Sequence, residues 1–222
     1  MSHAEALLTI SNLTRGYPEN AEKLFEHFDF TLRQGDFHVL MGQSGTGKTT
    51  LVKLITGELH APHDTVHYRL EDLSRFTELD MEAYRKKIGI IFQDYRLFDE
   101  ESVIENISYP LKIYGLGETI IETKVENIIK KLNLLKIKDM PVSSLSAGEK
   151  QKICLARALV HNPEFIIADE PTGNLDREHT QEVADLLIEA NKLGNTVFLI
   201  THDIHLVHYL KDKYTIQVDI LK

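Results

Sequence analysis

The sequence predicts an α/β fold in which a mixed sheet is flanked by helices, with an antiparallel β part near the N-terminus and a helical subdomain inserted later. Three observations lead to this prediction. Short apolar segments alternate with segments of helical period, which is typical of an α/β sheet. A glycine-rich turn at residues 42–50 joins an apolar segment to a helical one. Residues 103–135 have helical periodicity and contain no strand candidate, so we expect them to form the helical part.

The size and composition of the chain limit its class. With 222 residues the chain can bury a full core as one domain, in which we expect residues 1–93 and 161–222 to form the core and residues 94–160 the helical subdomain. A formal net charge of −9 argues against a general nucleic-acid binder, which needs a basic face. The single cysteine, Cys154, excludes an intramolecular disulfide. No run approaches 18 apolar residues, so a partner must supply any membrane span.

The N-terminal part predicts two strands joined by a turn. Residues 7–10 form a short apolar run, and residues 28–32 alternate between apolar and polar side chains. Between them, Gly16, Tyr17 and Pro18 are a turn signal. Tyr17 is either an ordinary surface residue or a flat ring on which a nucleotide base stacks, and both interpretations stay open.

Residues 42–50 fit the pattern of a phosphate-binding loop, between the apolar residues 37–41 and the helical run 51–55. Glycines let the backbone turn so that its N–H groups face a phosphate, and the helix start adds its dipole. Lys48 can reach the β- and γ-phosphates, and the hydroxyl of Thr49 is placed to bind Mg²⁺. We therefore expect an ATP or GTP site. Its residues are Gly42, Gln43, Ser44, Gly45, Thr46, Gly47, Lys48, Thr49 and Thr50.

The segment after the first helix leads to a second polar group at the sheet edge. Residues 65–70 predict an edge strand, residues 81–87 a short basic helix and residues 88–92 a buried strand. Gln93 follows that strand directly. Because ligands of α/β sheets bind beyond the carboxyl ends of the strands, Gln93 is placed to report on the ligand.

The helical stretch at residues 103–135 contains the breakers Pro110 and residues 115–117. Another helix follows Ser146, which forms a capping box with Glu149 three residues later. The alternative interpretation is a second anion-binding helix start in the same chain. The helix that this capping box opens is predicted at residues 150–160. The remaining elements that the pattern predicts are a helix at residues 180–193 and a strand at residues 195–200.

An apolar strand at residues 165–170 ends in two carboxylates. Next to a phosphate loop, Asp169 can hold Mg²⁺ through water, and Glu170 can polarise a water for attack on the γ-phosphate. His202 follows the next strand and faces the same phosphate. These residues predict nucleotide hydrolysis.

Two groups of histidines permit a metal site as a weaker hypothesis. The first group is His60, His63 and His67, which no thiol or clear carboxylate set accompanies, so a solvated loop is favoured. In the second, His205 and His208 share one face of a helix, but nearby His202 has the better role at the phosphate.

Over essentially its whole length the chain resembles the ATP-binding-cassette (ABC) ATPases. In chain order the matching residues are Tyr17 for base stacking, Gly42 to Thr49 for the phosphate loop, Gln93 for the glutamine loop, Leu145 to Glu149 for the signature, Asp169 for magnesium, Glu170 for catalysis, Leu175 and Asp176 for the dimer loop and His202 as the switch histidine. The signature usually has two consecutive glycines where this chain has Ala147 and Gly148.

The resemblance implies an ABC-type phosphate-loop core that binds and hydrolyses ATP. Glu170, His202 and Lys48 would be its catalytic groups. Mg²⁺ would be held at Thr49, Gln93 and Asp169. The active unit would be a head-to-tail homodimer, in which Ser146 and Gly148 of one subunit bind the ATP held by the other.

Residues 168–176 resemble the group of this family that includes lipoprotein-releasing, macrolide-exporting and cell-division ATPases. Residues 92–97 and 201–204 are most similar to the cell-division group, FtsE. This resemblance implies a peripheral subunit on the cytoplasmic face of the inner or plasma membrane, which pairs with an FtsX-like membrane protein and regulates cell-wall hydrolysis. The alternative is the ATPase subunit of a lipoprotein-releasing or macrolide-type transporter.

Two other classes are less consistent with the sequence. A soluble DNA-repair or translation ATPase needs a long coiled coil or a second cassette, and 222 residues without heptads hold neither, so no nucleic acid is expected as a partner. A module that binds ATP without turnover is opposed by Glu170 and His202. Residues 94–98 either anchor the membrane partner or simply pack Leu97 and Phe98 beneath the helices.

Overall fold

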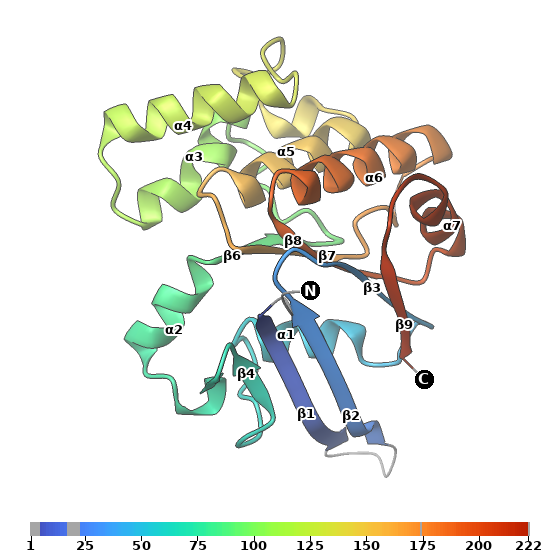
Figure 1. Cartoon of the computed structure of the whole chain (residues 1–222). Coiled ribbons are helices and arrows are strands. Elements are labelled where there is room, and N and C mark those ends of the chain that lie inside the picture. Colours follow the sequence, from blue (N-terminus) through green and yellow to red (C-terminus); the bar gives the residue numbers. More distant parts are fainter. Residues whose placement is uncertain (1–4, 17–22, 174, 222) are drawn as a thin grey trace.

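The computed structural model describes residues 5–16, 23–173 and 175–221. It contains two sheets, with one layer of helices above the larger sheet and a helix and the smaller sheet below it (Figure 1). This arrangement confirms the predicted α/β fold with an N-terminal antiparallel part.

The larger sheet has the strand order β6-β7-β8-β3-β9, and each neighbouring pair is parallel. Parallel sheets are buried on both faces, so their strands are continuous apolar runs. Along β8, Val197 and Leu199 contact the upper core, whereas Phe198 and Ile200 contact the lower one. The strands are β3 (Phe37–Gly42), β6 (Ile88–Ile91), β7 (Phe165–Asp169), β8 (Thr196–Thr201) and β9 (Gln217–Leu221).

The smaller sheet is antiparallel and has the order β2-β1-β4-β5. Its strands are β1 (Ala6–Gly16), β2 (Lys23–Arg33), β4 (Val66–Tyr68) and β5 (Glu71–Asp72). Strands β1 and β2 extend well beyond the predicted runs, because their ladder continues through bulges. The predicted edge strand at residues 65–70 is shorter, and β5 lies beyond it.

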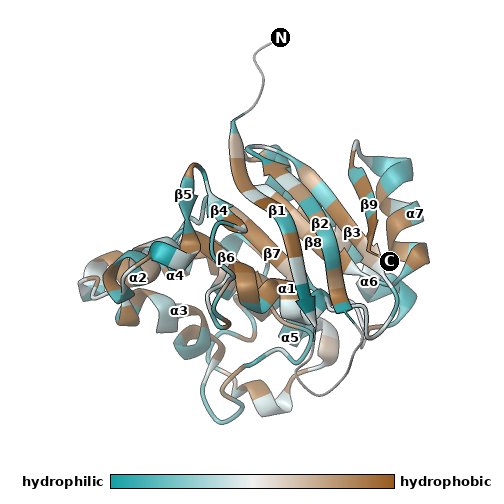
Figure 2. Cartoon of the chain, turned by 90° about the horizontal axis from the view of Figure 1, so that it is seen from below, coloured by the Kyte–Doolittle hydropathy of each residue, from teal (hydrophilic) through white to brown (hydrophobic). Residues whose placement is uncertain are grey.

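The helices divide between the two faces of the larger sheet. Helix α1 packs with the smaller sheet against the lower face, where Figure 2 shows apolar residues along β1 and α1. Helices α5 and α6 cover the upper face, with α3 and α4 packed outward of α5 (Figure 1). The helices are α1 (Lys48–Ile55), α2 (Glu78–Arg85), α3 (Val103–Ile113), α4 (Glu118–Lys131), α5 (Ala147–Leu159), α6 (Arg177–Lys192) and α7 (Ile204–Lys213).

Four helix predictions need correction. Helices α2, α5 and α6 begin three residues earlier than predicted, because the side chains of Thr77, Ser146 and Asp176 cap their first turns. Pro110 does not end α3, since the burial of Ile107 and Leu111 on either side of it outweighs one lost backbone hydrogen bond. In the described part of the chain, no helix combines the length and apolar character needed to cross a bilayer.

Candidate ATP-hydrolysis site

The loop between β3 and α1 is shaped by glycines that other residues could not replace. Gly45 and Gly47 have positive φ angles of 88° and 91°. A Cβ on Gly42 would lie 2.7 Å from Oγ1 of Thr46, too close to be accommodated without a shift. The hydroxyl of Thr46 donates a hydrogen bond to the carbonyl of Gln43 at 2.9 Å. The result is a tight turn directly before the N-terminus of α1, the geometry that binds phosphate.

Lys48 is buried at the start of α1. Its Nζ donates to the carbonyl oxygens of Gly42 at 2.7 Å and Gln43 at 2.8 Å, and lies 3.3 Å from Oε1 of Glu170. A buried ammonium group needs such partners. They hold its charge inside the loop, where it is available to a phosphate.

Glu170 follows β7, and its carboxylate has several partners. Oε1 accepts from Nδ1 of His202 at 2.7 Å, and Oε2 accepts from the hydroxyl of Thr201 at 3.1 Å and the backbone N–H of His202 at 3.2 Å. Glu170 has φ of 48°, in the left-handed region that costs a non-glycine residue about 1 kcal/mol or more. Strain of this kind is typical of functional residues held by their surroundings.

One hollow of about 220 Å³ collects most of the expected site residues. It is lined by Ser44, Gly45, Gly47, Lys48, Thr49, Thr50, Gln93, Glu170 and His202. The structure therefore brings together side chains from four separate segments, because the strands that carry them are neighbours and end at the same edge.

Asp169 ends β7 and is 6% exposed. The hydroxyl of Thr49 hydrogen-bonds its carboxylate, yet its Oδ1 has no hydrogen-bond partner among the described residues. Burial, and next the negative charge of Glu170, raise the pKa of Asp169 to about 6. A buried carboxylate oxygen without a partner is costly, and a divalent cation would satisfy it. The donors at this position, oxygen atoms of a carboxylate and a hydroxyl, fit Mg²⁺.

Gln93 lies beyond β6 and lines a second hollow, of about 350 Å³, together with Thr49 and Asp169. Gly173 lies against the side chain of Gln93, and a Cβ at this position would be only 3.3 Å from Nε2 of Gln93. The side chain predicted to report on the ligand is thus a neighbour of the candidate metal residues.

The capping box predicted at Ser146 and Glu149 is confirmed at the start of α5. Neither Ser146 nor Gly148 is among the residues that line the hollow over the phosphate loop, as far as the described residues go. Gly148 packs instead against the ring of His179 in α6, whose Nδ1 hydrogen-bonds Oδ1 of Asp176 at 2.8 Å. His179 therefore connects the signature with the dimer loop within one chain.

Some sequence hypotheses fall elsewhere. Tyr17 lies outside the described residues, so its stacking role stays a prediction. His63 interacts with Ser74 and Asp72, and His67 with Asp64. These histidines have local hydrogen-bond partners, and the described residues contain no group of three or more His, Cys, Asp or Glu side chains placed to hold a metal ion.

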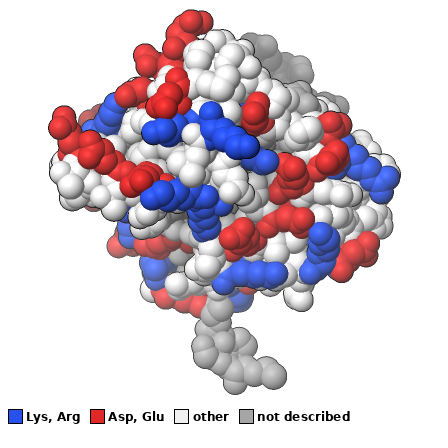
Figure 3. Space-filling view, turned by 90° about the horizontal axis from the view of Figure 1, so that it is seen from above, with Lys and Arg blue, Asp and Glu red and all other residues white. Residues whose placement is uncertain are grey.

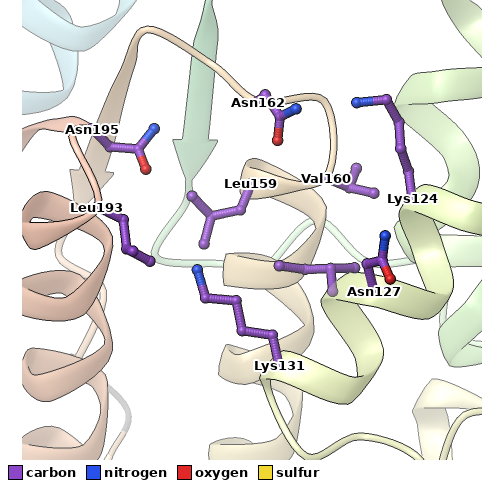
Figure 4. A pocket seen from close by; sticks show the side chains of 9 residues that line it. Lys124, Asn127, Lys131, Leu159, Val160, Asn162, Leu193 and Asn195 are labelled. Atoms are coloured by element: carbon purple, nitrogen blue, oxygen red, sulfur yellow. The ribbon is translucent and has the colours of Figure 1, made fainter.

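A separate hollow of about 500 Å³ lies between α4 and the C-terminal ends of α5 and α6 (Figure 4). Lys124 and Lys131 of α4 face Asn162 and Asn195 across it, around an apolar floor that includes Leu159. Its lining contains no carboxylate, hydroxyl or imidazole group and none of the expected site residues. This hollow is not the hydrolysis site.

The sequence did not predict two residues that contribute to the site. Thr201 donates to Glu170, and its hydroxyl directly before His202 is the sequence feature that could have indicated this role. Arg157 of α5 donates to the backbone of the segment after Gln93. No sequence signal indicated Arg157, because its role depends on how α5 packs on that segment.

The fold and this site are those of a phosphate-loop nucleotide hydrolase. The family model described as "ABC transporter" matches residues 25–173. The chain belongs to the ABC transporter family, as an ATP-binding subunit that hydrolyses ATP.

Named relatives are similar over most of the chain. The cell division ATP-binding protein FtsE of Haemophilus influenzae is 35% identical, over 90% of this chain and 92% of the relative. FtsE of Bacillus subtilis is 33% identical, over 93% and 90%. The methionine import ATP-binding protein MetN 2 of Enterococcus faecalis is 34% identical, over 95% of this chain and 62% of the relative.

Solved structures confirm the ABC-type fold. A dimeric post-hydrolysis state of the ATP-binding cassette MJ0796 bound to ADP and Pi has a TM-score of 0.82 and 26% identity, covering 97% of this chain and 94% of that chain. The cbiO1 protein of Clostridium perfringens, part of the ABC transporter complex cbiONQ, has a TM-score of 0.85 and 27% identity, covering 98% and 85%.

Proposed function

We propose that this chain is the ATPase of an FtsE-type complex on the cytoplasmic face of the membrane, where it couples ATP hydrolysis to an FtsX-like membrane protein that regulates cell-wall hydrolysis during division. The observation that carries the proposal is the match to FtsE proteins at 30–35% identity over about nine tenths of both chains. The residues 92–97 and 201–204, which resemble FtsE in sequence, flank the hydrolysis site.

In the proposed reaction the residues of the hollow over the phosphate loop have separate roles. The loop N–H groups and Lys48 bind the phosphates of ATP, and Glu170 accepts the proton of the attacking water. His202 and Thr201 hold the carboxylate of Glu170 in one orientation through their hydrogen bonds. Thr49, Gln93 and Asp169 would hold Mg²⁺. That ion would neutralise charge on the β- and γ-phosphates.

The proposed active unit is a head-to-tail homodimer. Ser146 and Gly148 do not line the hollow of their own chain, so the signature helix start would bind the γ-phosphate held by the other subunit. The dimeric MJ0796 cassettes among the similar structures support this arrangement.

The proposed membrane contact is a groove of about 540 Å³ beside the segment that follows Gln93. Phe98, Tyr109 and Ile113 line it and are 43%, 44% and 62% exposed. The rings of Phe98 and Tyr109 lie 4.7 Å apart and form a paired aromatic surface. Leu97 and Tyr95 instead pack against the core. Within this loop we therefore assign the partner contact to Phe98 and the packing role to Leu97. A short cytoplasmic helix of the partner would fit such an anchor.

The test is to identify the membrane protein that co-purifies from gently solubilised membranes. We expect a protein of FtsX type, and Phe98→Ala with Tyr109→Ala should lower its recovery about tenfold without changing basal ATP hydrolysis or the melting temperature. Leu79→Ala is the matched control, since Leu79 is 77% exposed on α2 and does not line the groove. Unchanged recovery from the double variant would contradict the groove.

A second candidate function is methionine import. MetN 2 is 34% identical over 95% of this chain, close to the FtsE values. The same co-purification separates the two candidates, because the membrane component of a methionine importer would then be recovered in place of an FtsX-like protein.

A further inference from the structure

The two consecutive residues that follow Gln93 and Asp94 have an unfavourable backbone conformation. Tyr95 and Arg96 have φ of 58° and 49°. Both lie in the left-handed region, which residues with a Cβ rarely adopt, and a bulky pair in that region is rarer still. Such a turn persists only where its surroundings hold it in place.

Arg157 provides that hold. Its guanidinium donates to the carbonyl oxygen of Tyr95 at 2.6 Å and to the carbonyl oxygen of Arg96. The thiol of Cys154, one turn earlier on α5, also donates to the carbonyl of Tyr95, at 3.4 Å. The two terminal nitrogens of the planar Arg157 guanidinium are thus both directed at this turn.

The turn contacts both chain neighbours of Gln93. The guanidinium of Arg96 lies over the ring of Phe92, 3.7 Å from its centroid, and its Nε lies 3.3 Å from Oδ1 of Asp94. Phe92 and Asp94 are the two neighbours of Gln93. The backbone adds hydrogen bonds from the N–H of Tyr95 to the carbonyl of Phe92 and from the N–H of Arg96 to that of Asp94. Any movement of the turn would therefore move Gln93.

We propose that Arg157 is a positioning residue for Gln93: its two bonds to the carbonyl oxygens of Tyr95 and Arg96 hold the strained turn that directs Gln93 toward Thr49 and Asp169. Arg157 does not line the hydrolysis hollow, so it acts on turnover without binding nucleotide. The inference rests on the proposed role of Gln93 at the magnesium residues. It also gives α5, whose first turn is the signature, a direct mechanical connection to the glutamine loop.

The first experiment compares Arg157→Gln with Arg85→Gln in the full chain. Arg85 is the matched control, because its guanidinium also donates to two backbone carbonyls, those of Thr56 and Gly57, away from the turn. We expect Arg157→Gln to lower kcat about tenfold while the KM for ATP stays within about twofold. In the nucleotide-free chain, amide exchange at residues 92–98 should speed up about tenfold. Arg85→Gln should change neither.

The second experiment tests the strain itself. Tyr95→Gly and Tyr95→Ala both remove the ring, but only glycine accepts positive φ without penalty. In the Arg157→Gln background, the glycine variant should turn over ATP about fivefold faster than the alanine variant. If Arg157→Gln does not fold, the same pair is compared in the Arg157→Lys background, where a single ammonium replaces the fork.

Unchanged kcat and exchange in Arg157→Gln, or equal rates for the glycine and alanine variants, would overturn the proposal. A failure of the proposed role of Gln93 gives a different result. In that case Gln93→Ala alone would leave turnover intact in a chain that keeps Arg157.

Discussion

At the scale of single residues, Glu170 and Lys48 have different proposed roles although they lie 3.3 Å apart. Glu170→Gln keeps the shape of the side chain and its oxygen can still accept from Thr201, but an amide does not take up a water proton. We expect turnover to fall at least about 10²-fold with ATP affinity within about threefold of the natural chain. Lys48→Ala removes a charged phosphate donor and should weaken ATP binding about tenfold or more.

Nucleotide affinity and steady-state hydrolysis, measured on both variants, check this prediction. Hydrolysis near the natural rate in Glu170→Gln would remove Glu170 from the role of general base.

The sequence could predict these residues because their chemistry and their chain neighbours are sufficient to recognise them. Gly42 to Thr50, Asp169 and Glu170 lie at the ends of apolar runs, where a loop or strand end presents polar groups. Thr201 and Arg157 could not be predicted in the same way. Their partners are 31 or more residues away along the chain, and only the packing of β8 beside β7 and of α5 on the glutamine loop brings them into contact.

At the scale of elements, the start of α5 packs closely against α6 because Gly148 has no side chain. A Cβ on Gly148 would lie 2.2 Å from Cδ2 of His179, and Asp176 restrains that ring through Nδ1. Gly148→Ala should therefore lower the free energy of unfolding by about 1–2 kcal/mol through overpacking. His179→Ala in the same chain should restore most of that loss. Urea unfolding of both single variants and the double variant measures this coupling, and purely additive effects would contradict it.

Strand β5 ends in a carboxylate whose ionisation contributes to folding. Asp72 is buried, which opposes ionisation, but hydrogen bonds from the side chain and backbone of Ser74 and the backbone of Asp64 prevail and lower its pKa to about 2. Because the folded pKa lies below the ordinary 3.8, the stabilisation is present above about pH 4 and is lost as the pH falls toward 2.

Asp72→Asn should accordingly lower the free energy of unfolding by about 2 kcal/mol at pH 7, and the difference from the natural chain should narrow toward pH 3. Urea unfolding across this range is the measurement. Glu71→Gln is the control, since Glu71 is exposed and should have no comparable effect. A difference that does not depend on pH would contradict the assignment to ionisation.

Element boundaries depended on signals of different strength. Apolar periodicity located the centres of the helices but not the starts of α2 and α6, where the first turns are polar and only the caps Thr77 and Asp176 mark the beginning. Pro110 gave a false break, because its cost is local while the burial that offsets it comes from α5 and α4. Local sequence rules fail here where tertiary packing decides.

At the scale of the whole molecule, the candidate hydrolysis site and the proposed partner groove are lined by different residues. The hollow over the phosphate loop lies at the carboxyl ends of the parallel strands, and the groove lined by Phe98 and Tyr109 lies beside the glutamine loop. Over the helical face, Lys and Arg side chains are interspersed with Asp and Glu (Figure 3). The order of the larger sheet places β7 between β6 and β8, so Gln93, Glu170 and His202 reach one site from strands far apart in sequence.

The proposed dimer can be tested by restoring activity from two inactive chains. Lys48→Ala disables the phosphate loop of its own subunit, and Ser146→Arg disables the signature that the subunit offers to its partner. In a head-to-tail pair of one of each, one composite site has both defects and the other has none. Each variant alone should be inactive, whereas an equal mixture should recover about a quarter of the natural rate, since half of the pairs are mixed and each has one intact site.

Hydrolysis by the mixture, measured over a range of total protein concentrations, completes the test. Activity should rise more steeply than the concentration where subunits dissociate, because two chains build each site. Lys48→Ala mixed with Glu170→Gln is the matched control, because both defects lie on the phosphate-loop side and every composite site then contains one of them. A Ser146→Arg chain that hydrolyses ATP at the natural rate as a monomer would show that the signature is not required across an interface.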